Sequence, residues 1–307
     1  MKHPAFALGW SILVLCVPLL VPPARAEPNA AEEALYRAEA LRTLPRGAAR
    51  RLFSIPANPA RLPAAAIGAY GRGCVAGAVR LASEGPGWQV VRLSRARNFG
   101  HPKLLAWIEA LAAGARKDGL PDLLIGDMAQ ARGGPMLTGH SSHQLGLEVD
   151  IWLTAAPAQR ILSIEERENM PAIDVVRPDL LEVNASFTPA HVALLRRAAL
   201  TPEVDRIFVN AAIKQAACRD TRYAAGERGW LSKLRPWPGH SEHFHVALKC
   251  PDAGCVKRNP FPSSDGCGKE LAHWFREDVR FPKPAPPPRI LKLNDLPQAC
   301  RKVLAAP

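Results

Sequence analysis

Two histidine-rich windows, about ninety residues apart, constrain this chain more than any other feature. The first spans residues 139–150 and reads GHSSHQLGLEVD, and the second spans residues 239–245 and reads GHSEHFH. Together they hold five of the nine histidines. Because imidazole is the commonest side-chain ligand of protein-bound metals, this clustering indicates metal chemistry.

Both windows have the period of a β-strand. In residues 243–248 apolar side chains alternate with His243 and His245, which is typical of a strand that buries one face and turns both histidines to the other. In residues 147–153 a second apolar series alternates with positions that include Asp150. Two strands are therefore expected to carry polar, metal-binding groups away from their apolar sides.

A third candidate ligand, His143, lies seven residues before Asp150 and upstream of Gly146, where a turn can bring the ring back over the carboxylate. Two of these imidazoles and the Asp150 carboxylate would give three protein ligands and leave a fourth position for water. That is the pattern of a catalytic zinc site.

The order of the expected elements predicts an α+β fold, with a mainly antiparallel sheet and flanking helices. Helices are expected in residues 27–45, from Pro102 to Gly119 and after Thr188, and strands in residues 88–93, 123–127 and 207–209. Helices and strands do not alternate regularly enough for a doubly wound sheet. The expected organisation is a signal peptide at 1–26, one domain at 27–281 and a Pro-rich tail at 282–307.

The N-terminus has the parts of a secretory signal: a charged start, an apolar run through Leu20 and the small-residue site Ala24-Arg25-Ala26. Cleavage is expected after Ala26. No later stretch is long and apolar enough to span a bilayer, so the mature protein is expected to be exported and not stably inserted in a membrane.

Signal removal would take away Cys16 and leave six cysteines, at 74, 218, 250, 255, 267 and 300. An even number in an exported chain favours disulfides, and the alternative of thiolate-bound zinc lacks a Cys-x-x-Cys pair. Six cysteines allow fifteen connectivities, among which spacing does not choose.

Basic residues exceed acidic ones by 12, and the signal holds two of them with no acid, so the mature excess is 12 − 2 = 10. This charge suits an acidic polymer at long range, and equally a solvated basic surface. No nucleic-acid motif is present, so no nucleic-acid partner is expected. The sequence leaves the oligomeric state open, a homodimer included.

Three motifs together resemble those of the penicillin-insensitive murein endopeptidases, within the lysostaphin and D-Ala-D-Ala metallopeptidase group. They are SHQxGLxVD at 142–150, RIFVN at 206–210 and RPWxxHxxHxH at 235–245. A lone His-x-His would be weak evidence, whereas the joint order and spacing are specific. The resemblance implies the hedgehog/D-Ala-D-Ala-peptidase-like zinc site of that group.

The resemblance also implies residue roles. The implied zinc ligands are His143, Asp150 and His245. His243 would stand beside the metal-bound water, His240 would be a further active-site histidine, and the proton-transfer and oxyanion roles of these two are not separated. His140 would match a histidine of an additional metal position. No convincing Asp-x-x-His follows in residues 154–187, so one zinc is expected and a second stays open.

The family's disulfide pattern, placed on this chain, implies Cys74–Cys300, Cys218–Cys267 and Cys250–Cys255. The first pair would pin the tail. Two acids near the motifs, Glu148 and Glu242, are interpreted as second-shell or surface groups rather than as bases.

The resemblance implies a periplasmic zinc metallopeptidase that hydrolyses the D-alanyl–meso-diaminopimelyl cross-link of peptidoglycan, for murein removal or remodelling. Two alternatives remain: a D-Ala-D-Ala carboxypeptidase of the same group, and a non-catalytic zinc- or peptidoglycan-binding protein. The presence of His240 and His243 favours the enzyme.

Overall fold

The computed structural model describes residues 28–157, 160–223, 225–260, 264–283 and 289–307. The expected signal peptide, residues 1–26, lies outside these ranges, as do residues 284–288 of the proline-rich stretch. Within the described ranges, no helix combines the length and apolarity that crossing a bilayer requires.

The chain folds into an α+β structure around a seven-stranded sheet, in agreement with the expected class. Among the described residues, four of the six neighbouring strand pairs are antiparallel, and β10–β9 and β5–β7 are parallel. In sheet order the strands are β10 (Leu234–Pro236), β9 (Val204–Val209), β11 (His243–Leu248), β8 (Glu148–Trp152), β7 (Leu123–Ile125), β5 (Trp88–Val90) and β4 (Glu84–Gly85).

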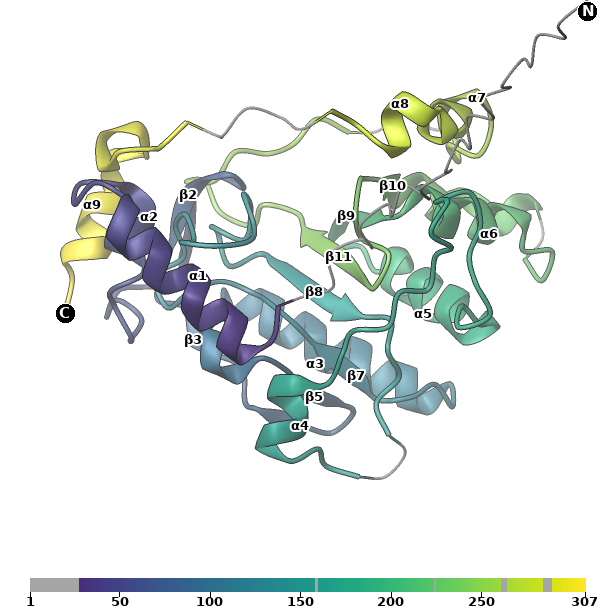
Figure 1. Ribbon diagram of the computed structural model, residues 1–307, viewed down its shortest axis with the longest axis horizontal. Helices are drawn as coiled ribbons and strands as arrows, with labels where there is room; N and C mark the ends of the chain where they lie inside the picture. Colours follow the sequence, from purple (N-terminus) through teal and green to yellow (C-terminus); the bar gives the residue numbers. More distant parts are fainter. Residues whose placement is uncertain (1–27, 158–159, 224, 261–263, 284–288) are drawn as a thin grey trace, which may run out of the picture.

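One face of the sheet is covered by α3 (Pro102–Lys117) and α5 (Pro189–Leu200) (Figure 1). The expected helix from Pro102 is confirmed, and the His101 side chain caps its N-terminus. Ile108 of α3 and Leu195 of α5 lie in the same buried cluster as Val149 of β8 and Val246 of β11. Their alternate neighbours in the two strands therefore turn to the opposite face.

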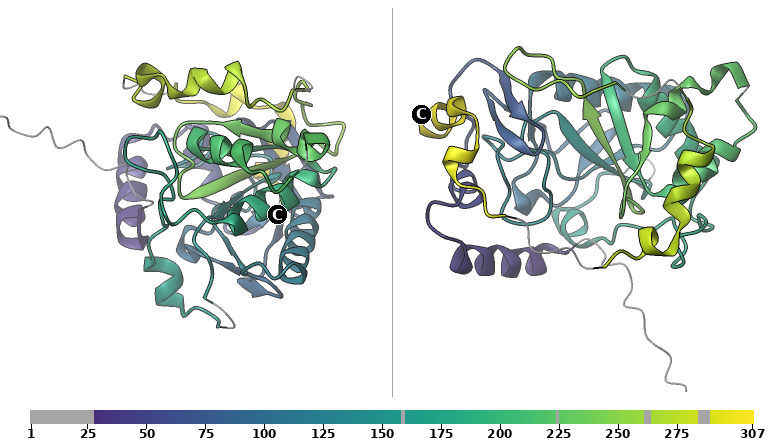
Figure 2. Two further views of the ribbon diagram at one scale, coloured as in Figure 1. Left: turned by 90° about the vertical axis from the view of Figure 1, so that its right-hand side faces the viewer. Right: turned by 90° about the horizontal axis from the view of Figure 1, so that it is seen from above.

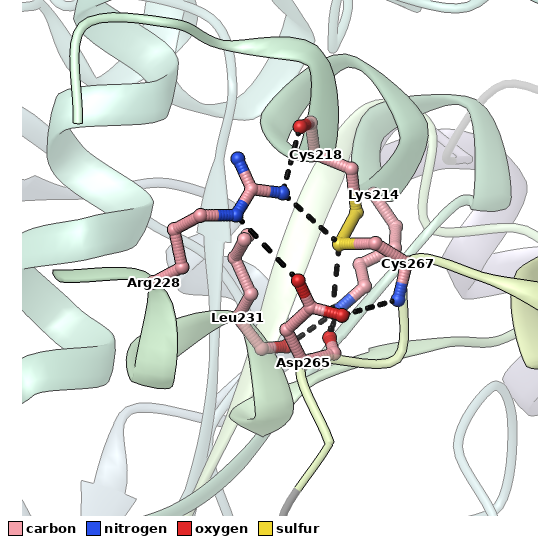
Figure 3. Close-up of a disulfide and its surroundings, with 6 residues drawn as sticks. All are labelled: Lys214, Cys218, Arg228, Leu231, Asp265 and Cys267. Atoms are coloured by element: carbon pink, nitrogen blue, oxygen red, sulfur yellow. Dashed lines mark hydrogen bonds and ion pairs between the residues drawn. A yellow bond between two sulfur atoms is a disulfide. The ribbon is translucent and has the colours of Figure 1, made fainter. Parts of the chain in front are cut away.

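On the other side of these strands from α3 lie α7 (Lys269–Ala272) and α8 (Glu277–Arg280), as Figures 1 and 2 show. This segment is tied back by the disulfide Cys218–Cys267, which joins it to α6 (Ala211–Arg219) (Figure 3). The Lys214 ammonium donates to the carbonyls of Leu231 and Asp265 at 2.5 Å each. Burial lowers the pKa of Lys214 to about 8.

The N- and C-terminal elements pack together at one end of the sheet (Figure 1). The disulfide Cys74–Cys300 joins strand β2 to helix α9 there. The elements of this end are α1 (Ala30–Thr43), α2 (Ala49–Phe53), β1 (Ala65–Ala69), β2 (Arg72–Ala76) and α9 (Gln298–Ala305). The short pair β3 (Val79–Arg80) and β6 (Phe99–Gly100) forms a separate two-stranded sheet.

Two expectations about local structure need correction. The strand expected at 88–93 ends at Val90, because Arg92 takes a left-handed conformation (φ 57°) before a 3-10 turn at Leu93–Arg95. Residues 154–187, interpreted as an irregular insertion, contain the helix α4 (Ile164–Asn169). A capping box between Ser163 and Glu166 starts that helix.

The disulfide Cys74–Cys300 is expected to stabilise the fold more than the disulfide Cys250–Cys255 does. The double substitution Cys74→Ser, Cys300→Ser is expected to lower the free energy of unfolding by about 2–5 kcal/mol, because this bridge closes a sequence separation of 226 residues. The matched control removes Cys250–Cys255, which spans 5 residues, and should cost less. Denaturant unfolding measures both, and an equal loss in the two variants would contradict the prediction.

Candidate metal centre

The site begins with the pairing of β8 and β11. In the antiparallel register His245 lies opposite Asp150, and His243 lies opposite Trp152. These side chains occupy the face turned away from α3 and α5, as the alternation predicted. Asp150 and His245 are buried, so their polar atoms face one another rather than water.

His143 reaches the same point from the loop before β8. It is fully buried and has a φ of 60°, and Gly146 follows with a φ of 65°. A Cβ at Gly146 would stand 2.8 Å from the backbone nitrogen of His101, so only glycine fits the close approach here. The turn expected upstream of Asp150 is therefore present and folds the ring of His143 over the strand.

The three donors expected from the sequence converge. His143 Nε2 lies 3.0 Å from His245 Nδ1, which lies 3.0 Å from Asp150 Oδ1, and His143 Nε2 lies 3.4 Å from Asp150 Oδ2. A zinc ion about 2.0 to 2.1 Å from each of several tetrahedral donors separates the donor atoms by about 3.3 Å. The distances between the nearest donor atoms of the three residues, 3.0 to 3.4 Å, are close to this separation.

Asp150 supplies an independent sign that a cation fits. Among the described residues, its Oδ2 is a buried oxygen without a hydrogen-bond donor. Burial alone would raise the carboxyl pKa, but the neighbouring histidines, His143 first, hold the pKa well below its usual range. A buried, ionised oxygen left without a donor is costly unless a positive charge satisfies it.

The histidines of the group differ in protonation state. Burial lowers the pKa of His143 and lowers that of His243 to about 4, so both rings are neutral at pH 7. Burial also opposes charge on His245, yet its hydrogen bonds to Asp150 and Glu148 raise its pKa to about 9. Metal uptake at Nδ1 of His245 would therefore release a proton.

His140 lies beside this group. Its Nε2 is 3.4 Å from Asp150 Oδ2, and the donor atoms of His140, His143 and Asp150 all lie within 4.8 Å of one another. The same nitrogen is 3.1 Å from Asp127 Oδ2. His140 is thus placed either as an alternative ligand or as a neighbour of the metal.

Asp127, which follows β7, connects His140 to two arginines. It is buried and accepts from Arg97 at 2.7 Å and from Arg95 at 3.1 Å, besides its contact with His140. The sequence around Asp127 does not predict these contacts, because the two arginines come from a separate turn.

His240 and His243 line the less buried side of the group. Their ring centroids are 5.0 Å apart, and His243 Nε2 is 3.8 Å from Asp150 Oδ1. His240 Nδ1 lies 3.0 Å from the carbonyl of Pro238, which can only accept, so this nitrogen carries the proton and Nε2 is left as an acceptor. Burial, with the neighbouring His243, lowers the pKa of His240 to about 3.

A hollow next to His240 extends the site. Trp237 is 53% exposed. Its ring contacts Phe208 and lines the hollow together with Trp274 and Arg280 of the α7–α8 region. The disulfide at Cys267 and the Lys214 contacts hold the start of this region in place (Figure 3).

The two acids near the motifs differ. Glu148 is fully buried, and its Oε1 accepts from His245 Nε2 at 3.1 Å, so it contacts a candidate ligand and does not lie at the surface. Glu242 lies half-buried just before β11, where its carbonyl accepts from the backbone nitrogen of Leu153.

Fold and site together define a class, namely an α+β protein with a buried His/Asp donor set of the kind that metallopeptidases use. Comparison with known proteins narrows this class. The family model for penicillin-insensitive murein endopeptidase matches residues 66–305, and the chain belongs to that family.

Relatives named penicillin-insensitive murein endopeptidase span most of the chain. The protein from Haemophilus influenzae is 40% identical over 80% of this chain and 84% of its own. Those from Yersinia enterocolitica and Klebsiella pneumoniae are 43% and 42% identical, each over 78% of this chain and over 85% and 86% of their own.

Proposed function

We propose that this protein is a murein endopeptidase that uses a zinc ion, held by His143, Asp150 and His245, to hydrolyse the D-alanyl–meso-diaminopimelyl cross-link. The observation that carries the proposal is the convergence of three buried side chains, His143, Asp150 and His245, whose nearest donor atoms lie 3.0 to 3.4 Å apart. Family membership supports the substrate. In this proposal the centre is of the lysostaphin and D-Ala-D-Ala peptidase type.

His245 is preferred to His140 as the third ligand because its Nδ1 lies 3.0 Å from a donor atom of both other ligands, whereas His140 also binds Asp127. His140 is then a neighbour that can serve an additional metal position. A single zinc held by these residues would satisfy the buried Oδ2 of Asp150, which has no hydrogen-bond donor among the described residues.

When bound, zinc supplies Lewis acidity that lowers the pKa of water toward about 7 and polarises the scissile carbonyl. His243, neutral at pH 7 and 3.8 Å from Asp150, takes a proton from the attacking water and returns it to the leaving amine. His240, with its Nε2 free to accept, holds an N–H of the substrate backbone and so orients the peptide. The exposed Trp237 provides an apolar wall beside it.

Purified cross-linked muropeptide dimers test this function. Zinc-loaded protein is expected to convert dimers to monomers, chelation should stop the reaction and added zinc should restore it. A β-lactam should have no effect, because no acyl-serine forms. Dimers that persist in the presence of zinc would reject the proposal, and loss of one alanine from a pentapeptide with dimers left intact would select the carboxypeptidase alternative.

We propose further that residues 1–26 are removed during export, that residues 27–281 form the catalytic domain, and that Cys300 holds the 282–307 tail. Three disulfides among the described residues, with the pairs that the resemblance implied, support an oxidising compartment such as the periplasm. The mass of the mature protein from a periplasmic extract tests this, and an intact N-terminus there would contradict it.

A further inference from the structure

One buried carboxylate contacts both histidines assigned as ligands. Glu148 Oε1 accepts from His245 Nε2 at 3.1 Å, and Oε2 accepts from the backbone N–H of His143 at 2.6 Å. Glu148 is fully buried on the same face of β8 as Asp150. Its contacts with the site are made through His143 and His245.

The contact with His245 selects a tautomer. A carboxylate can only accept, so Glu148 keeps a proton on Nε2. The proton released on metal uptake then comes from Nδ1, the nitrogen that lies 3.0 Å from both His143 Nε2 and Asp150 Oδ1, and the lone pair of the neutral ring is left there. Carboxylates that orient ligating histidines in this way raise metal affinity.

The contact with His143 stabilises a strained backbone. A left-handed φ of 60° in a residue other than glycine costs on the order of 1 kcal/mol or more. A charge-assisted hydrogen bond from the His143 N–H to Glu148 offsets this cost and fixes the loop that presents the ring.

Arg258 holds the carboxylate in turn. Its Nη2 donates to Glu148 Oε1 at 3.1 Å, and its guanidinium lies 3.4 Å from the ring centroid of Tyr70. The Tyr70 hydroxyl donates to the carbonyl of Leu248 at 2.5 Å, at the end of β11. Arg258 also faces Asp205, at 3.6 Å, so two carboxylates compete for it.

We propose that Glu148 is the positioning residue of the metal centre, presenting the ligating atoms of His143 and His245 together, and that Arg258, stacked on Tyr70, fixes Glu148 for this role. The inference rests on the ligand assignment of the proposed function. Glu148 itself touches neither metal nor substrate.

Substitution of Glu148 by glutamine tests the inference on the full chain. An amide has one acceptor oxygen and cannot accept from both His143 and His245, so zinc affinity should fall about 10- to 100-fold in titrations against a chelating dye. NMR of the ¹⁵N-labelled histidine rings of the zinc-loaded protein should show that His245 loses its Nε2–H tautomer. Thermal unfolding monitored in parallel reports whether the fold is kept.

Two substitutions of Arg258 and one control substitution test whether the arginine fixes Glu148. Arg258→Met should also lower the zinc affinity, but by less than about tenfold. Arg258→Lys should show a smaller loss than Arg258→Met. Asp205→Asn removes the other carboxylate that faces Arg258, and should leave both the zinc affinity and the His245 tautomer unchanged.

Wild-type zinc affinity and an unchanged His245 tautomer in E148Q would overturn the inference. If E148Q does not fold, R258M decides, and wild-type affinity there would overturn it as well. Zinc affinity and the His245 tautomer are both measured without substrate. If E148Q binds zinc more weakly as expected but the wild-type protein does not cleave muropeptide dimers, the result contradicts the proposed reaction and not the role of Glu148. Absence of zinc binding by the wild-type protein would instead remove the metal on which both depend.

Discussion

His143→Ala is expected to remove tightly bound zinc and to lower kcat/KM for muropeptide dimers by roughly 10³-fold or more, since the metal contributes several kcal/mol of transition-state stabilisation. The variant deletes one of three donors that lie 3.0 to 3.4 Å apart. It also leaves the ionised Asp150 with one fewer neighbour. Zinc content by elemental analysis and dimer cleavage are measured on the same preparation.

The matched control for this loss is His273→Ala, which removes an exposed histidine outside the site. It should keep both zinc and rate. Retention of one zinc per chain and of activity by His143→Ala would contradict the ligand assignment. Loss of the fold in His143→Ala would show as a changed circular dichroism spectrum, and Asp150→Asn then provides the second substitution.

His243→Ala is expected to keep zinc and to lower kcat about 10²- to 10⁴-fold, which is the usual contribution of a positioned general acid or base. His243 lies on the same face as the ligands, but its Nε2 is 3.8 Å from Asp150, farther than the donor atoms of the ligands are from one another. Its pKa, lowered to about 4 mainly by burial, keeps it neutral and able to accept a proton at pH 7.

Single-turnover cleavage of dimers by zinc-loaded His243→Ala measures this loss. A variant that loses zinc would reassign His243 as a ligand. A variant with zinc and an unchanged rate would show that His243 takes no part in proton transfer, and would support the binding-protein alternative if the wild-type protein were also inactive.

The part of the site that the sequence predicted comes from local periodicity. Alternation in residues 243–248 and around Asp150 placed these side chains on one face, and the strands have that register. The turn before Asp150 was predicted from Gly146, and its φ of 65° agrees. The helix beginning at Pro102 was predicted from its start signal and is confirmed.

The remaining part depends on contacts between distant segments, which no local pattern encodes. Arg258 meets Glu148 across 110 residues, and Arg97 meets Asp127 across 30. A carboxylate on an alternating strand looks the same in sequence whether it binds metal, as proposed for Asp150, or supports the ligands.

The most direct test is the anomalous scattering of a zinc-loaded crystal at the zinc absorption edge. One strong peak per chain is expected within about 2.0 to 2.2 Å of His143 Nε2, His245 Nδ1 and an Asp150 oxygen. A peak held by His140 and Asp127 without His245, or no peak near these side chains, would contradict the proposed zinc site.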